Sequence, residues 1–114
     1  MRVNRCGLVI TEKQLQELVR ELAGYLRLLC YHTHDSRRSE PGFPDLVIVG
    51  PNGVLFRELK SARGVLTTDQ EQWLSALGAA CQNADVWRPG DWPDRIRREL
   101  EVVARTTVAH EVTR

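Results

Sequence analysis

Residues 42–60 decide the fold, and they have the sequence GFPDLVIVGPNGVLFRELK. Asp45 to Val49 is a short apolar, β-branched run, which is typical of a buried strand. Gly50 to Gly53 forms a turn, because its Asn-Gly pair favours the positive φ angles of a tight hairpin. Val54 to Lys60 is then the returning strand. The sequence therefore predicts a β-hairpin at the centre of the domain.

The segments on either side of this hairpin alternate between helical and strand patterns. Both predicted helices that flank it begin with capping-box spacing, Thr11-x-x-Gln14 and Thr67-x-x-Gln70. Before the hairpin, the sequence predicts a helix with apolar residues as far as Leu26 and a strand from Leu28 to Thr33. After it, the sequence predicts a helix beginning near Thr68 and a strand from Asp85 to Trp87. A final helix is capped by Asp91 and carries Ile96, Leu100 and Val103.

These elements predict one α/β domain over residues 1–114, with the order α-β-β-β-α-β-α. Its core is a mixed sheet of about four strands, flanked by helices. We expect residues 1–10 to form an N-terminal arm and residues 106–114 to form a tail that frays. A length of 114 residues suits one domain with a single hydrophobic core.

The composition is that of a globular protein, with 42% hydrophobic and 27% charged residues. No apolar run approaches the length of a membrane helix, and the N-terminus lacks the apolar segment of a signal peptide, so we expect an intracellular protein. Cys6, Cys30 and Cys81 are widely spaced and form no C-x-x-C pair, which argues against a zinc knuckle. We expect Cys30 and Cys81 to be buried, reduced thiols and Cys6 to lie in the arm.

Acidic and basic side chains flank the hairpin at one edge. Asp45 begins its first strand, and Glu58 follows thirteen residues later, near the end of the second strand. Side chains alternate along a strand, so Glu58 and Lys60 share one face while Leu59 points into the core. Folding at the turn brings Asp45 close to Glu58. Two crowded carboxylates repel each other unless a cation lies between them, and one or two carboxylates commonly hold Mg²⁺.

Two interpretations fit these three residues. In the first, Glu58 and Lys60 are an exposed pair on a surface strand and Asp45 caps a turn; the spacing alone favours it, because the pattern is loose and frequent. In the second, the carboxylates hold a metal that generates a hydroxide nucleophile, and the lysine orients water or neutralises charge. The second interpretation supplies everything that phosphodiester hydrolysis needs.

Basic residues are unevenly distributed, although the formal net charge is only +1. Arg37, Arg38, Arg57, Lys60 and Arg63 fall within one third of the chain. Clustered positive charge can meet a phosphate backbone without making the whole protein basic. The alternative is a solvated face.

Four motifs follow one another from Gly42 onwards, and together they resemble the VRR-NUC family. They are Gly42-x-Pro44-Asp45-Leu46, Glu58-Leu59-Lys60, Gly64-Val65-Leu66-Thr67 and Gln70-x-x-Trp73-Leu74. The resemblance covers about Thr11 to Leu100 and continues through Val86–Pro89 and Asp91-Trp92, as in small phage-encoded members. This family is the virus-type replication-repair nuclease branch of the PD-(D/E)xK superfamily. The resemblance implies a restriction-endonuclease-like fold.

The resemblance also implies roles for individual residues. Asp45 and Glu58 would bind Mg²⁺ or Mn²⁺, with the Leu59 main-chain carbonyl, and Lys60 would be the catalytic lysine. Gln70 would support the site from the second helix, and Glu12 would face it from the first helix. Two alternatives stay open: Gln70 only closes a capping box, and Glu12 only favours the helix dipole.

Further residues are candidates for substrate binding or for packing. Ser36, Arg37 and Ser39 suit contacts to phosphate oxygens, and Arg63 lies in a neighbouring loop; a solvated loop is the alternative. His32 and His34 are two residues apart near a strand end, where substrate contact or packing fits better than a metal pair. Trp73 and Trp87 are expected in the core rather than as stacking platforms for bases.

The predicted function is that of a metal-dependent DNA endonuclease, selective for branched DNA such as flaps or four-way (Holliday) junctions, in phage replication, recombination or repair. The family and the single active site suggest a homodimer, with the first helix or the C-terminal segment as the interface. Two alternatives remain: a catalytically silent DNA-binding module with the same fold, and a restriction-type endonuclease that recognises a base sequence.

Overall fold

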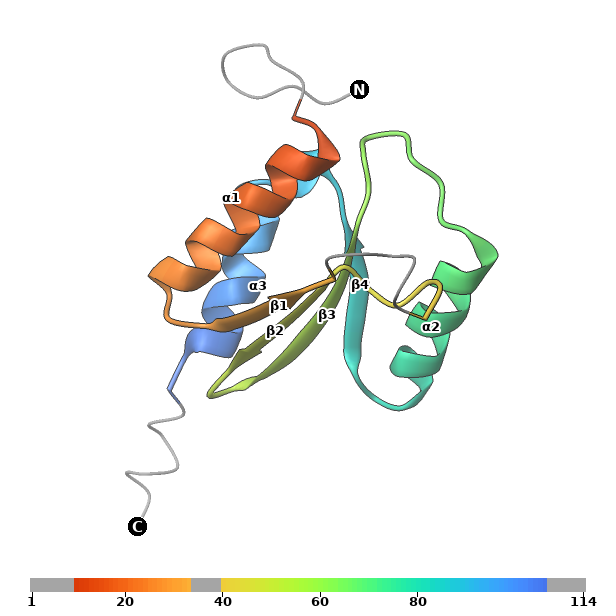
Figure 1. The fold of residues 1–114 in the computed structure, drawn as a ribbon. Coiled ribbons are helices and arrows are strands. Elements are labelled where there is room, and N and C mark those ends of the chain that lie inside the picture. Colours follow the sequence, from red (N-terminus) through yellow and green to blue (C-terminus); the bar gives the residue numbers. More distant parts are fainter. Residues whose placement is uncertain (1–9, 34–39, 107–114) are drawn as a thin grey trace.

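The computed structural model describes residues 10–33 and 40–106. Their order of elements is the predicted α-β-β-β-α-β-α, with one short 3-10 turn, η1, before the last helix (Figure 1). The elements are α1 (Glu12–Tyr25), β1 (Leu29–His32), β2 (Leu46–Gly50), β3 (Gly53–Leu59), α2 (Thr68–Ala79), β4 (Asn83–Trp87), η1 (Pro89–Asp91) and α3 (Asp94–Ala104). The strand and helix ends differ from the predicted ones by a few residues at most. The fold prediction is confirmed.

The four strands form one mixed sheet in the order β1-β2-β3-β4. β1 pairs with β2, and β2 with β3, in antiparallel fashion, while β4 lies parallel to β3. The predicted hairpin between β2 and β3 closes with Gly50 opposite Gly53, whose φ of 146° suits glycine alone. This register places Leu46, the residue after Asp45, opposite Arg57, the residue before Glu58.

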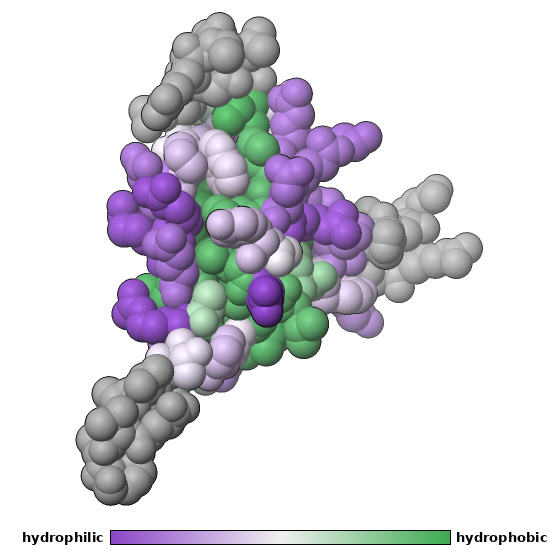
Figure 2. All heavy atoms as spheres, turned by 90° about the vertical axis from the view of Figure 1, so that its left-hand side faces the viewer, coloured by the Kyte–Doolittle hydropathy of each residue, from purple (hydrophilic) through white to green (hydrophobic). Residues whose placement is uncertain are grey.

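The two faces of the sheet are covered differently. α1 and α3 lie together over one face, and α2 lies on the opposite side, near β4 (Figure 1). The face under α1 and α3 carries the hydrophobic core, in which β-strand side chains such as Leu46, Ile48 and Leu55 have no exposed surface. Seen from that side, apolar atoms reach the surface between two hydrophilic flanks (Figure 2). No residue of α2 is fully buried, so this helix rests on the sheet rather than completing the core.

The hairpin is fixed against the end of α3. The Asn52 main-chain N–H donates to the Val103 carbonyl at 3.0 Å, and its side-chain amide donates to the Val102 carbonyl at 2.9 Å. A Cβ added at Gly50 would lie 2.3 Å from the Val103 oxygen, so glycine permits this close approach. None of the helices in the described residues has the length and apolarity needed to cross a membrane.

The predictions for Asp91 and Cys81 are wrong. Asp91 does not cap the last helix: α3 begins at Asp94 after Pro93, and Asp91 ends η1, where its carboxylate accepts from the Arg88 main-chain N–H at 2.8 Å. Cys81 is exposed rather than buried, because it lies just beyond the end of α2 with a left-handed φ of 65°. Cys30 is partly buried, and Cys6 lies outside the described residues, as do most of the predicted arm and tail.

Candidate active site

Asp45 lies immediately before β2, and hydrogen bonds hold it on both sides. One carboxylate oxygen, Oδ2, accepts a hydrogen bond of 2.8 Å from the Leu59 main-chain N–H on β3. The Asp45 carbonyl accepts from the Thr33 N–H at 3.1 Å, just beyond the end of β1. This side chain is therefore fixed to the strand that carries Glu58, as the hairpin predicts.

Glu58 is a carboxylate with little access to water. It lies on β3 next to Leu59, which is completely buried in the core, and only 3% of Glu58 is exposed. Its Oε2 accepts a hydrogen bond of 2.9 Å from the Gln70 amide. Its other oxygen, Oε1, is buried and has no hydrogen-bond partner among the described residues. Burial of this kind is unfavourable for an ionised carboxylate unless a cation or a donor compensates it.

Electrostatics link four side chains into one cluster. Burial, followed by the negative charge of Asp45 and a hydrogen bond that protonated Glu58 can make to it, raises the pKa of Glu58 from 4.5 to about 8, against the lowering effect of Lys60. Burial and Asp45 also raise the pKa of Glu12, and Lys60 again opposes the shift. Glu12 therefore faces the site from the start of α1, where a cavity of about 420 Å³ is lined by Glu12, Asp45, Thr11, Lys13 and Gln16.

Gln70 makes both of the contacts that the sequence left as alternatives, the capping box and a hydrogen bond to Glu58. Its side-chain oxygen accepts from the Thr67 main-chain N–H at 2.9 Å and completes the capping box of α2. Its side-chain nitrogen donates to Glu58. An amide has a donor and an acceptor, so one residue caps the helix and orients the carboxylate at the same time.

The loop before Asp45 is packed against the start of α2, which explains part of the Gly42 motif. Gly42 has a φ of +88°, and a Cβ at this position would lie 2.4 Å from the Asp69 main-chain carbon. Trp73 donates from Nε1 to the Pro41 carbonyl at 3.1 Å, and its ring meets Phe43 edge-on at 5.0 Å between centroids. Trp73 is thus only partly buried and lies outside the hydrophobic core, so of the two tryptophans expected in the core only Trp87 lies there.

The donor set fits a hard divalent cation. Asp45 and Glu58 provide carboxylate oxygens, and the unpartnered Glu58 Oε1 is an acceptor that a cation would satisfy. In the part of the chain that the structure describes, no group of three or more histidine, cysteine, aspartate and glutamate side chains is arranged to hold a metal. Mg²⁺ and Mn²⁺ do not require such a group, because they keep several water ligands and bind substrate phosphate as well.

The remaining candidate residues are placed less closely around this cluster. His32 ends β1 and is partly buried, opposite Leu46 in the register. Arg63 is exposed in the loop between β3 and α2. Ser36, Arg37 and Ser39 lie outside the described residues, as do His34 and Arg38.

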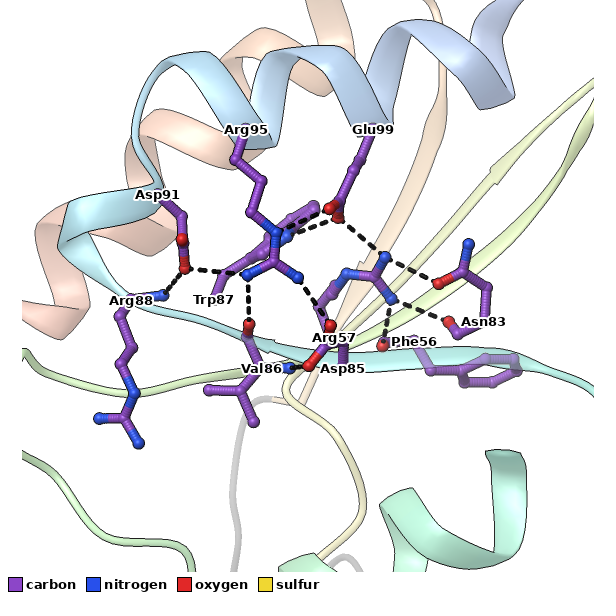
Figure 3. A network of polar contacts seen from close by, with 10 residues as sticks. All are labelled: Phe56, Arg57, Asn83, Asp85, Val86, Trp87, Arg88, Asp91, Arg95 and Glu99. Carbon is purple, nitrogen blue, oxygen red and sulfur yellow. Dashed lines mark hydrogen bonds and ion pairs between the residues drawn. The ribbon is translucent and has the colours of Figure 1, made fainter. Parts of the chain in front are cut away.

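Arg57 does not belong to a phosphate-facing surface, so its inclusion in the basic cluster is wrong. Only 2% of its surface is exposed, and its guanidinium donates to Glu99 on α3 at 2.9 Å (Figure 3). It also lies 5.0 Å from the centre of the Trp87 ring, and Trp87 itself donates to Glu99 at 2.8 Å. Alternation along β3 directs Arg57 away from Glu58 and toward α3.

Glu99 is the centre of this network, which joins β3, β4 and α3. Burial alone would raise its pKa, but hydrogen bonds from Arg95, Arg57 and Trp87 outweigh burial and hold the pKa below its usual value. Arg95 also reaches Asp85 on β4 at 2.6 Å (Figure 3). The strand that carries Glu58 is thereby fixed from the opposite face of the sheet. Sequence analysis missed this network, because Glu99 is 42 residues from Arg57.

Comparison with known proteins agrees with this fold. A family model of the VRR-NUC domain matches residues 5–87, which include Glu12, Asp45, Glu58, Lys60 and Gln70. A solved structure, a "VRR_NUC domain protein", has a TM-score of 0.61 at 20% identity over 87% of this chain and 99% of that chain, a likeness of fold. No protein of curated function matches this chain. Because the family model covers most of the sequence, the chain belongs to the VRR-NUC family, whose members share a nuclease fold.

Proposed function

We propose that this protein is a metal-dependent DNA endonuclease that hydrolyses phosphodiester bonds, and that its active site contains Asp45, Glu58 and Lys60. One observation carries the proposal. The Glu58 carboxylate is buried beside Asp45, with one oxygen held by Gln70 and the other without a partner among the described residues. Ionising Glu58 here is costly in the absence of a cation, and strongly perturbed carboxylates cluster at functional sites.

Each residue of the cluster has a distinct task in this proposal. Asp45 and Glu58 would hold Mg²⁺ or Mn²⁺, and the Leu59 carbonyl would be a further oxygen ligand. When bound, the cation supplies charge stabilisation on the phosphate and a water of lowered pKa. Gln70 keeps the Glu58 carboxylate in one orientation through its 2.9 Å hydrogen bond, while the Leu59 N–H does the same for Asp45 at 2.8 Å.

Lys60 follows Glu58 by two residues, and its main chain is anchored by a hydrogen bond to the Trp87 carbonyl at 3.1 Å. Its ammonium would orient the attacking water or neutralise charge as the phosphorane-like transition state forms. The charges of Asp45 and Lys60 both shift the pKa of Glu12, so Glu12 at the start of α1 lies close enough to interact electrostatically with the site. The proposal assigns it a supporting role in catalysis.

The substrate is proposed to be branched or otherwise structured DNA, as the family resemblance implies. Arg63 is exposed in the loop after Lys60 and suits a phosphate contact, and we assign substrate contacts also to His32, Ser36, Arg37 and Ser39. One domain of this size carries one such cluster in its described part, so symmetric cutting of two strands calls for two copies. A homodimer acting in phage replication, recombination or repair is the simplest form of the proposal.

The proposal is tested by incubating the protein with a panel of end-labelled flap, fork, four-way-junction, duplex and single-stranded DNA. We expect cleavage with Mg²⁺ or Mn²⁺, none with EDTA, and a preference for branched substrates. Binding without cleavage of any substrate, by folded protein with either metal, would instead support the silent DNA-binding module. Cleavage confined to one base sequence, whatever the DNA shape, would support a restriction-type enzyme.

A further inference from the structure

Arg88 lies just beyond β4 and clamps the turn that follows Lys60. Its Nη1 nitrogen donates to the Ser61 carbonyl at 2.8 Å and to the Gly64 carbonyl at 2.7 Å. The main chain of Arg88 is fixed as well, because its N–H donates to Asp91 at 2.8 Å. In Figure 3 the Arg88 guanidinium points away from the Arg57–Glu99 network, so it serves a different part of the molecule.

The clamped turn lies close to the side chain of Lys60. A Cβ added at Gly64 would lie 3.3 Å from Cδ of Lys60 and 3.0 Å from Oγ of Ser61. A larger residue at position 64 would therefore crowd the aliphatic stem of the lysine. The Lys60 main-chain N–H donates to the carbonyl of Trp87, the residue before Arg88. Trp87 thus holds the main chain of Lys60, and Arg88 holds the turn that lies beside its side chain.

A lysine side chain needs such support in order to act at a fixed point. Its four-carbon stem is flexible, and ordering it costs rotamer entropy. A displacement of about 1 Å of a reacting group can cost about 100-fold in rate. The Arg88 guanidinium donates to two carbonyls of the turn of residues 61–64, so it can hold that turn in place beside the Lys60 stem.

We infer that Arg88 is a positioning residue that acts through the turn of residues 61–64 on the ammonium group of Lys60. It sets the rate of the cleavage step and leaves DNA affinity almost unchanged. The inference rests on the proposed function, because it assumes that Lys60 takes part in cleavage. It assigns no direct contact between Arg88 and DNA.

The test compares Arg88→Ala with Arg97→Ala, which removes an exposed arginine of α3. Single-turnover cleavage is measured with Mg²⁺, and the Kd for the same DNA is measured with Ca²⁺ in its place. We expect Arg88→Ala to lower the cleavage rate by about 10–100-fold and to change the Kd by less than about twofold. Arg97→Ala should change neither. If Arg88→Ala fails to fold, Arg88→Gln replaces it with the same expectation.

A double-mutant cycle shows whether Arg88 acts through Lys60. In the Lys60→Ala background, Arg88→Ala should cause no further loss of rate, because the group that it positions is absent. Added methylguanidinium should restore part of the rate of Arg88→Ala, because its N–H groups can again donate to the Ser61 and Gly64 carbonyls. Multiplying losses in the double variant, or a loss confined to DNA affinity, would overturn the inference.

The two proposals fail in different ways. Wild-type protein that cleaves no DNA overturns the proposed function, and with it the role of Arg88. Wild-type protein that cleaves, together with an Arg88→Ala variant that cleaves at the same rate, overturns the role of Arg88 alone.

Discussion

Glu58→Gln should stabilise the metal-free protein while it abolishes cleavage. Glu58 is 3% exposed, and its pKa is raised from 4.5 to about 8 by burial and by Asp45. The folded state therefore holds one more proton than the unfolded chain between these two values. Stability is highest below about pH 4.5 and is lost as the pH rises toward 8. A glutamine has the same shape and never ionises, so the variant avoids this loss.

The expected gain follows from the cost of ionising Glu58. Each pKa unit corresponds to about 1.4 kcal/mol between the two protonation states, so the cost amounts to several kcal/mol at most. Entry of water next to the ionised Glu58 carboxylate lowers this cost. At about pH 9 we expect Glu58→Gln to raise the free energy of unfolding by about 1–3 kcal/mol and the Tm by about 5–15 °C. At about pH 5 wild-type Glu58 is protonated, so the gain should nearly vanish.

Thermal and urea unfolding at both pH values, with EDTA and then with Mn²⁺, measure this effect. Glu17→Gln on the exposed side of α1 is the matched control, and it should show no pH-dependent gain. Mn²⁺ should raise the Tm of the wild type and leave that of Glu58→Gln almost unchanged. The Tm advantage of the variant over the wild type should therefore shrink or reverse when Mn²⁺ is added. An equal difference between variant and wild type at both pH values would refute the reasoning.

Three further predictions concern other parts of the site and its support. Asp45→Asn should weaken Mn²⁺ binding in a calorimetric titration by at least about tenfold, and an unchanged titration would count against Asp45 as a ligand. Thr67→Ala should cost about 1 kcal/mol of stability and leave the cleavage rate unchanged, because the hydrogen bond from Gln70 to Glu58 remains. Gln70→Ala removes that hydrogen bond as well and should slow cleavage by about tenfold; equal cleavage rates for the two variants would show that Gln70 does not support Glu58 in catalysis. Arg57→Met should lower the free energy of urea unfolding by about 3 kcal/mol, because it leaves Glu99 without one of its donors, and a loss below about 0.5 kcal/mol would show that the network contributes little.

Local patterns predicted most of the fold, because they report local physics. The Asn-Gly turn fixed the hairpin, and the two capping boxes at Thr11 and Thr67 marked the starts of α1 and α2 to the residue. Alternation along β3 placed Leu59 in the core, and the hairpin turn brought Asp45 beside Glu58. These features depend on residues close in sequence, so a single chain is enough to predict them.

The Arg57 network was missed because its partners are far apart in sequence. Alternation already puts Arg57 on the core side with Leu55 and Leu59, and this was the available signal. Its acceptor, Glu99, comes from a helix whose angle to the sheet no local pattern determines. The cap at Asp91 failed for a related reason, because the Arg88 N–H and Arg95 compete for that carboxylate in the folded chain.

The most direct test of the central claim is the single-turnover rate of cleavage of branched DNA by wild type and Lys60→Ala, with Mn²⁺ and with EDTA. Both proteins must have the same Tm within a few degrees and the same Kd for the DNA in Ca²⁺. We expect wild type to cleave only with Mn²⁺, and Lys60→Ala to be slower by about 1,000-fold or more while it still binds. Metal-independent cleavage, or equal rates for the two proteins, would contradict a metal-assisted reaction at Asp45, Glu58 and Lys60.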